Sequence, residues 1–90
     1  MKTTHVIVEG LVQGVFFRDY TCRQALKLHL TGWVQNLPDR TVEVLIQGEP
    51  SAIESMLTWL EKGSPRSTVK KLNVQKIETT EQVSTFEVRY

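Results

Sequence analysis

The residues best suited to chemistry lie in one run near the start of the chain, residues 9–18, which reads EGLVQGVFFR. An apolar segment enters a turn that contains Gly14, and Arg18 follows at the predicted start of a helix. A glycine lets backbone N–H groups turn inward and approach a ligand closely. The first turn of a helix adds unpaired N–H groups and the positive end of its dipole. Because the Arg18 guanidinium is a fork of donors suited to phosphate, the run predicts a site for a phosphate or a carboxylate.

Asn36 is the second polar residue of interest, and it precedes Leu37, Pro38 and Asp39. It can start a turn, which is a common role of asparagine. It can also orient a water molecule, because an amide offers donors and acceptors but no titrating proton. Arg18 taken by itself has two interpretations as well, a solvated helix residue or a cation that binds phosphate. The two residues alone do not decide between these interpretations.

The other reactive side chains have structural explanations. His5 lies near the chain start, and His29 lies near the end of a predicted helix, where the helix dipole favours a cation. Cys22 is the one cysteine, so an internal disulfide and a CxxC site are excluded, and we expect a small buried thiol. No cluster has the spacing of metal ligands, so we expect no metal. Phe16 and Phe17 are expected to pack the loop onto the core.

Length and charge narrow the class of protein. A chain of 90 residues with a net charge of +1 forms one domain and has no broad positive field for nucleic acid. No apolar run approaches the length of a membrane span, and the first residues lack the apolar core of a signal peptide. We therefore expect a cytoplasmic monomer with no nucleic-acid or membrane partner.

Hydrophobic patterning predicts five strands and two helices. The expected strands lie at residues 6–12, 33–37, 42–46, 69–77 and 86–90, the expected helices at residues 18–30 and around 53–60, and a polar turn at residues 78–82. Gly10 marks an irregularity near the end of the first strand, and Gly32 suits the stop of the first helix. Ser51 and Glu54 are expected to form a capping box for the second helix, which Gly63 ends. The apolar face expected for the first helix comprises Tyr20, Cys22, Ala25, Leu26 and Leu28.

This order of elements, βαββαβ plus a terminal strand, predicts the α+β class. The expected fold is a ferredoxin-like two-layer sandwich, with a largely antiparallel sheet, two helices on one face and a short extra C-terminal strand. In that topology the first and second strands run in the same direction. The loop after the first strand and the end of the second strand then share one end of the sheet, which can bring Arg18 and Asn36 together.

Two motifs carry a family resemblance. The run GLVQGVFFR at residues 10–18, followed by GWVQN at residues 32–36, resembles the signature of acylphosphatases. The same order of features continues with VEV at residues 42–44, GSP at 63–65 and FEVRY at 86–90. The resemblance spans nearly the whole chain, and no position that would carry chemistry departs from the family pattern.

The resemblance implies that residues 1–90 form one domain that hydrolyses acyl phosphates to a carboxylate and inorganic phosphate. Arg18 and Asn36 are then the catalytic residues, with Asn36 positioning the attacking water. The phosphate-binding residues, through their backbone N–H groups and the Arg18 guanidinium, are Gln13, Gly14, Val15, Phe16, Phe17 and Arg18. The resemblance implies no metal or organic cofactor, and the partner is a small-molecule acyl phosphate.

A binding module without catalysis is the rival interpretation, because small βαββαβ domains also bind RNA or sense ligands. An RNA reader is expected to carry aromatic residues on its central strands and a basic face. Residues 6–8 and 42–46 contain no aromatic residue. A sensor is expected to lack the group that positions water, whereas Asn36 is present.

Overall fold

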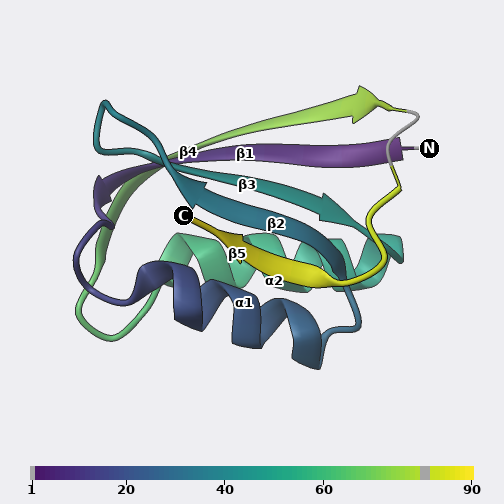
Figure 1. The fold of residues 1–90 in the computed structure, drawn as a ribbon, viewed down its shortest axis with the longest axis horizontal. Helices are drawn as coiled ribbons and strands as arrows, with labels where there is room; N and C mark the ends of the chain where they lie inside the picture. Colours follow the sequence, from purple (N-terminus) through teal and green to yellow (C-terminus); the bar gives the residue numbers. More distant parts are fainter. Residues whose placement is uncertain (1, 80–81) are drawn as a thin grey trace.

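Two helices pack against one face of a five-stranded sheet (Figure 1). The computed structural model describes residues 2–79 and 82–90. The strands follow the order β4-β1-β3-β2-β5 across the sheet, and every neighbouring pair is antiparallel except β2 and β5. The predicted ferredoxin-like sandwich is therefore confirmed. The elements are β1 (Lys2–Leu11), α1 (Phe17–Lys27), β2 (Thr31–Asn36), β3 (Val42–Gln47), α2 (Pro50–Lys62), β4 (Thr68–Glu78) and β5 (Phe86–Arg89).

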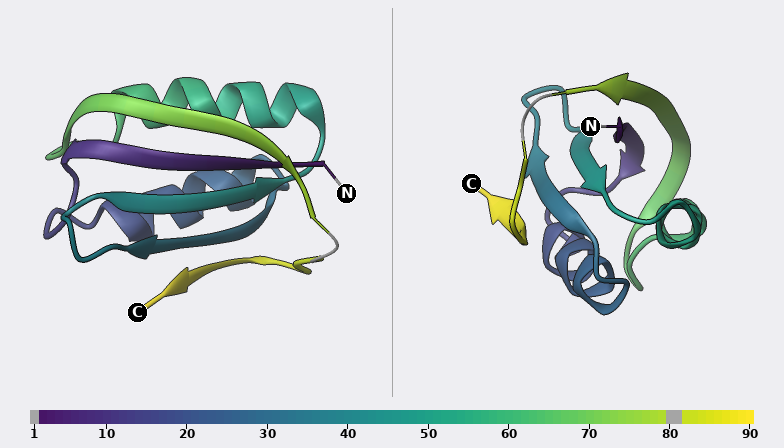
Figure 2. Two further views of the ribbon diagram at one scale, coloured as in Figure 1. Left: turned by 90° about the horizontal axis from the view of Figure 1, so that it is seen from above. Right: turned by 90° about the vertical axis from the view of Figure 1, so that its right-hand side faces the viewer.

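The core lies between the sheet and the helices, which sit together on the concave side of the twisted sheet (Figure 2). Alternate residues of the central strands face inward, as the strand period of two requires. The fully buried side chains of the core come from three strands, both helices and the loops between them: Val6, Val8, Val12, Phe17, Ala25, Val34, Val42, Val44, Ile46, Met56 and Leu60.

Helix α1 ends earlier than its sequence pattern predicts. His29 adopts a left-handed conformation with φ of 59°, and Leu30 N–H then bonds back to Ala25 O at 2.9 Å. His29 N–H bonds to Leu26 O at 3.1 Å, which completes a Schellman motif with histidine in the usual position of glycine. Gly32, expected to stop this helix, lies in β2, where a Cβ would meet Leu45 O of β3 at 1.8 Å.

The buried face of α1 also differs from the expected one. Phe17, Thr21 and Ala25 are its buried residues, whereas Tyr20 and Leu26 are 37% and 49% exposed. The spacing of four residues between the buried positions is the helical repeat that faces the sheet. Tyr20 and Leu26 are apolar in type, but they fall on the outer side of the helix.

Helix α2 begins without the predicted capping box. Pro50 is its first residue and Glu49 is the cap, and no side chain of the described residues makes a capping hydrogen bond there. A proline at the first position fixes φ near the helical value and has no N–H to satisfy. The start therefore lies before Ser51, and Ser51 and Glu54 are inside the helix rather than at its cap. Gly63 ends the helix as predicted, with φ of 78°.

The ends of β1 and β2 meet at one edge of the sheet. The pairing of β1 with β4 shifts register between Glu9 and Gly10, so the irregularity predicted at Gly10 is confirmed. Both β1 and β2 pair antiparallel with β3 and therefore run in the same direction. The loop after β1, the end of β2 and the end of β5 consequently lie close together at one end of the molecule (Figure 1).

Three smaller expectations differ at strand ends. Strand β2 ends at Asn36, so Leu37 lies in the hairpin loop, and β5 ends at Arg89, which leaves Tyr90 96% exposed. The polar segment expected as a turn at residues 78–82 begins inside β4 at Glu78, and residues 80 and 81 lie outside the described residues. Neither α1 nor α2 is long and apolar enough to cross a membrane.

Candidate active site

The loop between β1 and α1 ends in a backbone conformation that presents N–H groups. Phe16, the cap of α1, is left-handed with φ of 59° and ψ of 24°, and Phe17 begins the right-handed helix. A left-handed residue beside a right-handed one directs successive N–H groups toward a common point, which suits an anion. No side chain of the described residues caps this helix start. The first N–H groups of α1 are therefore left without a capping partner.

Gly14 provides the close approach to this point. Its φ is 76°, a conformation that side chains rarely adopt. A Cβ built on Gly14 would meet no atom within 4 Å, so the residue faces open space rather than packed protein. The loop thus has a glycine where the backbone borders a cavity.

Gln13 ties the loop to the hairpin between β2 and β3. Its side-chain amide donates to Leu37 O and to Thr41 O, both at 2.9 Å. Asn36 is the residue directly before Leu37, so these bonds fix the end of β2 relative to the loop. Sequence reasoning counted Gln13 only among the backbone donors and did not find this role of its side chain.

The Arg18 guanidinium is held by the end of the chain. Its Nη1 donates to Arg89 O at 3.0 Å, and its Cζ lies 4.7 Å from the centre of the Tyr90 ring. A cation over an aromatic face is attracted by the ring quadrupole. One N–H group of the fork is thus used for positioning. The other N–H groups have no hydrogen-bond partner within residues 2–79 and 82–90.

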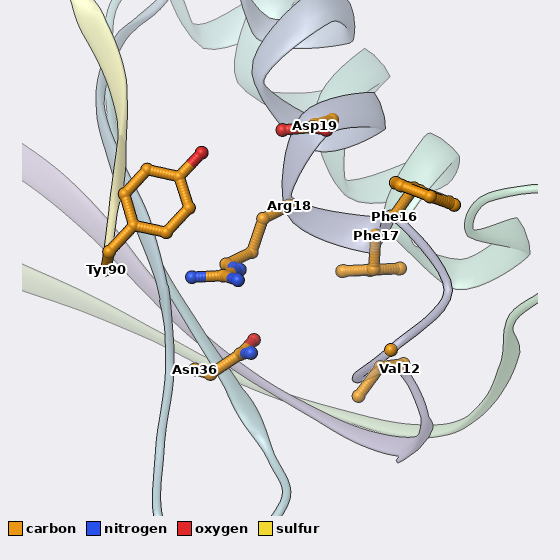
Figure 3. Close-up of a pocket in the computed structure, with 8 residues that line it drawn as sticks. Val12, Phe16, Phe17, Arg18, Asp19, Asn36 and Tyr90 are labelled. Carbon is orange, nitrogen blue, oxygen red and sulfur yellow. The ribbon is translucent and has the colours of Figure 1, made fainter.

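Arg18 and Asn36 border the same cavity, of about 320 Å³ (Figure 3). The Asn36 amide points toward the guanidinium from the floor of this site, and Tyr90 and Phe17 lie on opposite sides of it. The Asn36 Oδ1 atom is buried and accepts no hydrogen bond from the described protein. The lining residues are Val12, Gly14, Phe16, Phe17, Arg18, Asp19, Asn36 and Tyr90.

The structure thus brings together most of the residues that the sequence selected. Gly14, Phe16, Phe17, Arg18 and Asn36 line the cavity, whereas Gln13 and Val15 do not. Phe16 was expected to pack onto the core, but its side chain is 70% exposed, because its left-handed backbone turns the ring outward.

Sequence reasoning missed three lining residues, which are Val12, Asp19 and Tyr90. Tyr90 follows an alternating apolar pattern and was placed in the last strand, but no pattern within the sequence could pair it with Arg18. Asp19 was expected in the first turn of α1, and it does lie there, where a carboxylate complements the helix dipole.

Burial, with the nearby Asp19 charge, raises the pKa of the Cys22 thiol. Cys22 is therefore a poor nucleophile at neutral pH.

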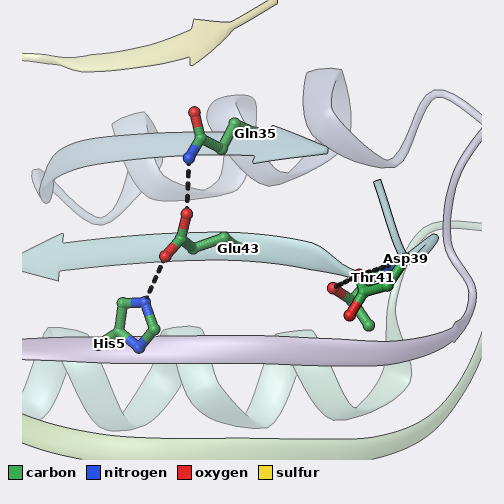
Figure 4. A network of polar contacts seen from close by, with 5 residues as sticks. All are labelled: His5, Gln35, Asp39, Thr41 and Glu43. Carbon is green, nitrogen blue, oxygen red and sulfur yellow. Dashed lines mark hydrogen bonds and ion pairs between the residues drawn. The ribbon is translucent and has the colours of Figure 1, made fainter. Parts of the chain in front are cut away.

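A polar network crosses the sheet face opposite the helices and supports this edge (Figure 4). His5 Nε2 lies 2.7 Å from Glu43 Oε2, and Gln35 Nε2 donates to Glu43 Oε1 at 2.6 Å. Burial raises the pKa of Glu43, but the hydrogen bonds from His5 and Gln35 and the electrostatic influence of the nearby His5 and Arg89 side chains outweigh it. The pKa of Glu43 is therefore held below its ordinary value. His5 has a structural role here and does not line the cavity.

This network includes neighbours of both site residues. Gln35 directly precedes Asn36, and Arg89 supplies the carbonyl that holds Arg18. The Arg89 guanidinium also lies over the Trp33 ring, with Cζ 4.4 Å from its centre. In the hairpin beyond, Asp39 accepts hydrogen bonds from the Thr41 backbone and hydroxyl (Figure 4). These bonds hold the pKa of the Asp39 carboxyl below its ordinary value.

Comparison with known sequences gives one family. The acylphosphatase family model matches residues 4–88. An acylphosphatase of Bordetella parapertussis is 51% identical over 72 residues, which are 80% of this chain and 77% of that protein. An acylphosphatase of Methylococcus capsulatus is 41% identical over 88 residues, which are 98% of this chain and 96% of that protein.

Solved structures show the same likeness in three dimensions. The crystal structure of an acylphosphatase from Bacillus subtilis has a TM-score of 0.95 and 37% identity, and the match covers 100% of both chains. An acylphosphatase from Coxiella burnetii has a TM-score of 0.92 and 42% identity over 98% of this chain and 92% of that chain. The chain therefore belongs to the acylphosphatase family, whose activity is the hydrolysis of acyl phosphates.

Proposed function

We propose that this acylphosphatase binds the phosphoryl group of its substrate in the cavity between the β1–α1 loop and Asn36. The backbone N–H groups of Gln13, Gly14, Val15, Phe16, Phe17 and Arg18, together with the Arg18 guanidinium, hold the phosphate oxygens. Asn36 orients the water that attacks phosphorus. The observation that carries this proposal is the shared cavity: Arg18, an uncapped helix start and Asn36 all border it.

The reaction asks little of the protein beyond positioning and charge. The bond from phosphorus to the carboxyl oxygen breaks, and the leaving carboxylate belongs to an acid with a pKa of about 4, so it needs no general acid at neutral pH. Phosphoryl transfer is helped mainly by holding the reactants in line and by neutralising charge on the equatorial oxygens. Arg18 and the backbone N–H groups supply those functions without a titrating group.

The amide of Asn36 suits a water that attacks phosphorus. The Asn36 side chain borders the cavity beside Arg18 (Figure 3), and its Oδ1 accepts no hydrogen bond from the described protein. A water that donates one hydrogen to Oδ1 keeps an oxygen lone pair free to face phosphorus. An amide is not a base at neutral pH, so the second proton of the water passes to a phosphate oxygen of the substrate. The products are a carboxylate and inorganic phosphate.

We further propose that the enzyme is a monomer and lies in the cytoplasm. It uses no metal or organic cofactor, and it has no nucleic-acid or membrane partner. The support for this proposal is chemical: Arg18 and the N–H groups already carry the positive charge that a metal would bring. A single cysteine, Cys22, suits a reducing compartment. Sedimentation equilibrium tests the monomer, and localisation of the tagged protein in its source cells tests the compartment.

Phosphate release from benzoyl phosphate tests the proposed site. We expect Arg18→Ala to lower kcat/KM by a factor on the order of 10³ or more and to weaken binding of inorganic phosphate. Arg18→Lys is also expected to be poor, because a point charge does not reproduce a bidentate fork. The matched control is Arg40→Lys in the exposed β2–β3 hairpin. If Arg18→Ala kept the kcat/KM of the wild type, the proposed site would be wrong.

A further inference from the structure

Phe16 is an unusual residue to find at the mouth of a phosphate cavity. Phe16 is 70% exposed, and its backbone is left-handed, which is uncommon for a bulky residue. No aromatic or cation contact of Phe16 is present among the described residues, whereas the Tyr90 ring across the cavity already covers the Arg18 guanidinium. Of the two exposed rings beside the cavity, Phe16 is therefore the one whose face is free to contact a ligand.

A second cavity adjoins the first one and shares Phe16 with it. This second cavity has a volume of about 270 Å³ and is lined by Val15, Phe16, Tyr20, Pro65 and Arg66. The β1–α1 loop, the first turn of α1 and the loop between α2 and β4 form its walls. Its surface is largely apolar, and Arg66 is the one charged residue among the described residues that line it.

Arg66 has no carboxylate partner within residues 2–79 and 82–90, and its side chain is exposed. An arginine with free N–H groups beside an apolar wall suits a ligand that has an apolar body and an anionic end. We call the N–H groups of residues 13–18 and the Arg18 guanidinium the phosphate cradle. A substrate whose phosphoryl group is bound there places its acyl group outside the cradle. The second cavity is next to the cradle, because Phe16 lines both cavities.

Resting on the proposed function, we propose that the second cavity binds the acyl group of the substrate. Phe16 and Tyr20 contact the carbon body of that group, and Arg66 attracts a negative charge at its far end. The preferred substrates are then acyl phosphates with an aromatic or otherwise apolar body that carries a second anionic group. Substrates with a short neutral acyl group use the phosphate cradle alone.

Four acyl phosphates separate these contacts: acetyl, benzoyl, 4-methylbenzoyl and 4-carboxybenzoyl phosphate. Benzoyl against acetyl phosphate measures the contact with the carbon body. The 4-carboxybenzoyl and 4-methylbenzoyl compounds have similar shapes and differ in charge. Comparing each variant with the wild type on the same pair of substrates cancels the intrinsic reactivity of the compounds. The measured quantity is therefore the ratio of two kcat/KM values.

We expect Tyr20→Ala to lower the benzoyl to acetyl ratio about three- to tenfold, because an apolar contact is lost. Phe16→Ala is expected to act in the same direction, but Phe16 also caps α1, so Tyr20→Ala is the cleaner variant. Leu26→Ala is the matched control, since Leu26 is an exposed apolar residue of the same helix outside both cavities.

For the charged end, we expect Arg66→Gln to lower the 4-carboxybenzoyl to 4-methylbenzoyl ratio about two- to fivefold at low ionic strength. The wild-type ratio is expected to fall as salt is added, because exposed charges are screened. Lys71→Gln on β4 removes the same charge away from the second cavity and is expected to leave the ratio unchanged.

A benzoyl to acetyl ratio that is unchanged in Tyr20→Ala would overturn the contact with the carbon body. A 4-carboxybenzoyl to 4-methylbenzoyl ratio that is unchanged in Arg66→Gln would overturn the contact with the charged end. If both ratios were unchanged, the proposed acyl site would be wrong. Loss of the 4-carboxybenzoyl preference in Lys71→Gln would show a general charge effect and would also overturn the role of Arg66. If the wild type hydrolysed none of the four compounds, the proposed function itself would be overturned. Turnover of acetyl phosphate with unchanged ratios would leave the proposed function standing and remove only the acyl site.

Discussion

Replacement of Asn36 by alanine separates catalysis from stability. The Asn36 Oδ1 atom is buried with no partner in the described protein, and leaving a buried acceptor unsatisfied costs about 1–3 kcal/mol. Alanine removes that cost, but it also removes packing of the side-chain stem, which contributes about 1 kcal/mol. The two effects offset, so we expect the free energy of unfolding of Asn36→Ala to rise or to stay within about 1 kcal/mol of the wild type.

Catalysis is expected to respond in the opposite way. Loss of the group that orients water is expected to lower kcat about 10²-fold or more, because a displaced nucleophile reacts slowly. Affinity for inorganic phosphate is expected to persist, since Arg18 and the backbone N–H groups are unchanged. The measurements are kcat with benzoyl phosphate, calorimetric titration with phosphate, and urea unfolding.

Asn73→Ala is the matched control, because Asn73 lies on β4 and donates to Glu9 Oε2 at 2.7 Å on the exposed surface. It is expected to leave kcat unchanged. Asn36→Ala would refute the reasoning if it lost more than about 2 kcal/mol of stability together with its activity, since Asn36 would then be structural. Lost phosphate affinity with preserved kcat would instead move Asn36 from the water to the bound anion.

Three further predictions concern metal, pH and the backbone. Activity is expected to survive EDTA, and activity that was lost in EDTA and restored by a divalent metal would instead show a metal site. The value of kcat is expected to vary little from pH 6 to 8 after correction for substrate ionisation, because arginine and amide groups do not titrate there. Glu43→Gln is expected to be less stable than the wild type at pH 7, and the difference is expected to shrink in acid. The lowered pKa of Glu43 gives stability that is present above its unfolded pKa and lost as pH falls through its folded pKa; a difference independent of pH in urea unfolding would contradict this. His29→Gly is expected to raise the free energy of unfolding by about 1 kcal/mol with unchanged kcat, because glycine adopts φ of 59° without strain; a less stable variant would show that the His29 side chain contributes more than its backbone costs.

The sequence was sufficient for the fold and for the meeting of Arg18 with Asn36. Period-two patterning in residues 42–46 and helical spacing in residues 53–60 are local signals, and the order of elements then fixes which strand ends share an edge. Topology therefore predicted the neighbourhood of two residues that lie in different elements.

Details that depend on long-range contact were not predictable in the same way. The bonds of Arg18 to the end of β5 depend on the parallel pairing of β5 with β2, and no local pattern encodes that pairing. The exposure of Phe16 depends on its left-handed backbone, whereas residue type alone favours burial. Ser51 and Glu54 have the right spacing for a capping box, but the fixed φ of Pro50 moved the helix start.

The distribution of titrating groups separates the effect of acid on folding from its effect on catalysis. Glu43 and His5 lie on the sheet face opposite the helices. Glu43 accepts a hydrogen bond from Gln35, which directly precedes Asn36, and it lies near Arg89, whose carbonyl holds Arg18. The cavity itself combines an arginine, an amide and backbone N–H groups, and among the described residues Asp19 is the one that lines it with an acidic side chain. Acid that protonates Glu43 therefore weakens the hydrogen bonds that Glu43 makes with His5 and Gln35, whereas the proposed catalytic groups stay unchanged. We accordingly infer that inactivation at low pH, once substrate ionisation is accounted for, follows unfolding rather than titration of Arg18 or Asn36.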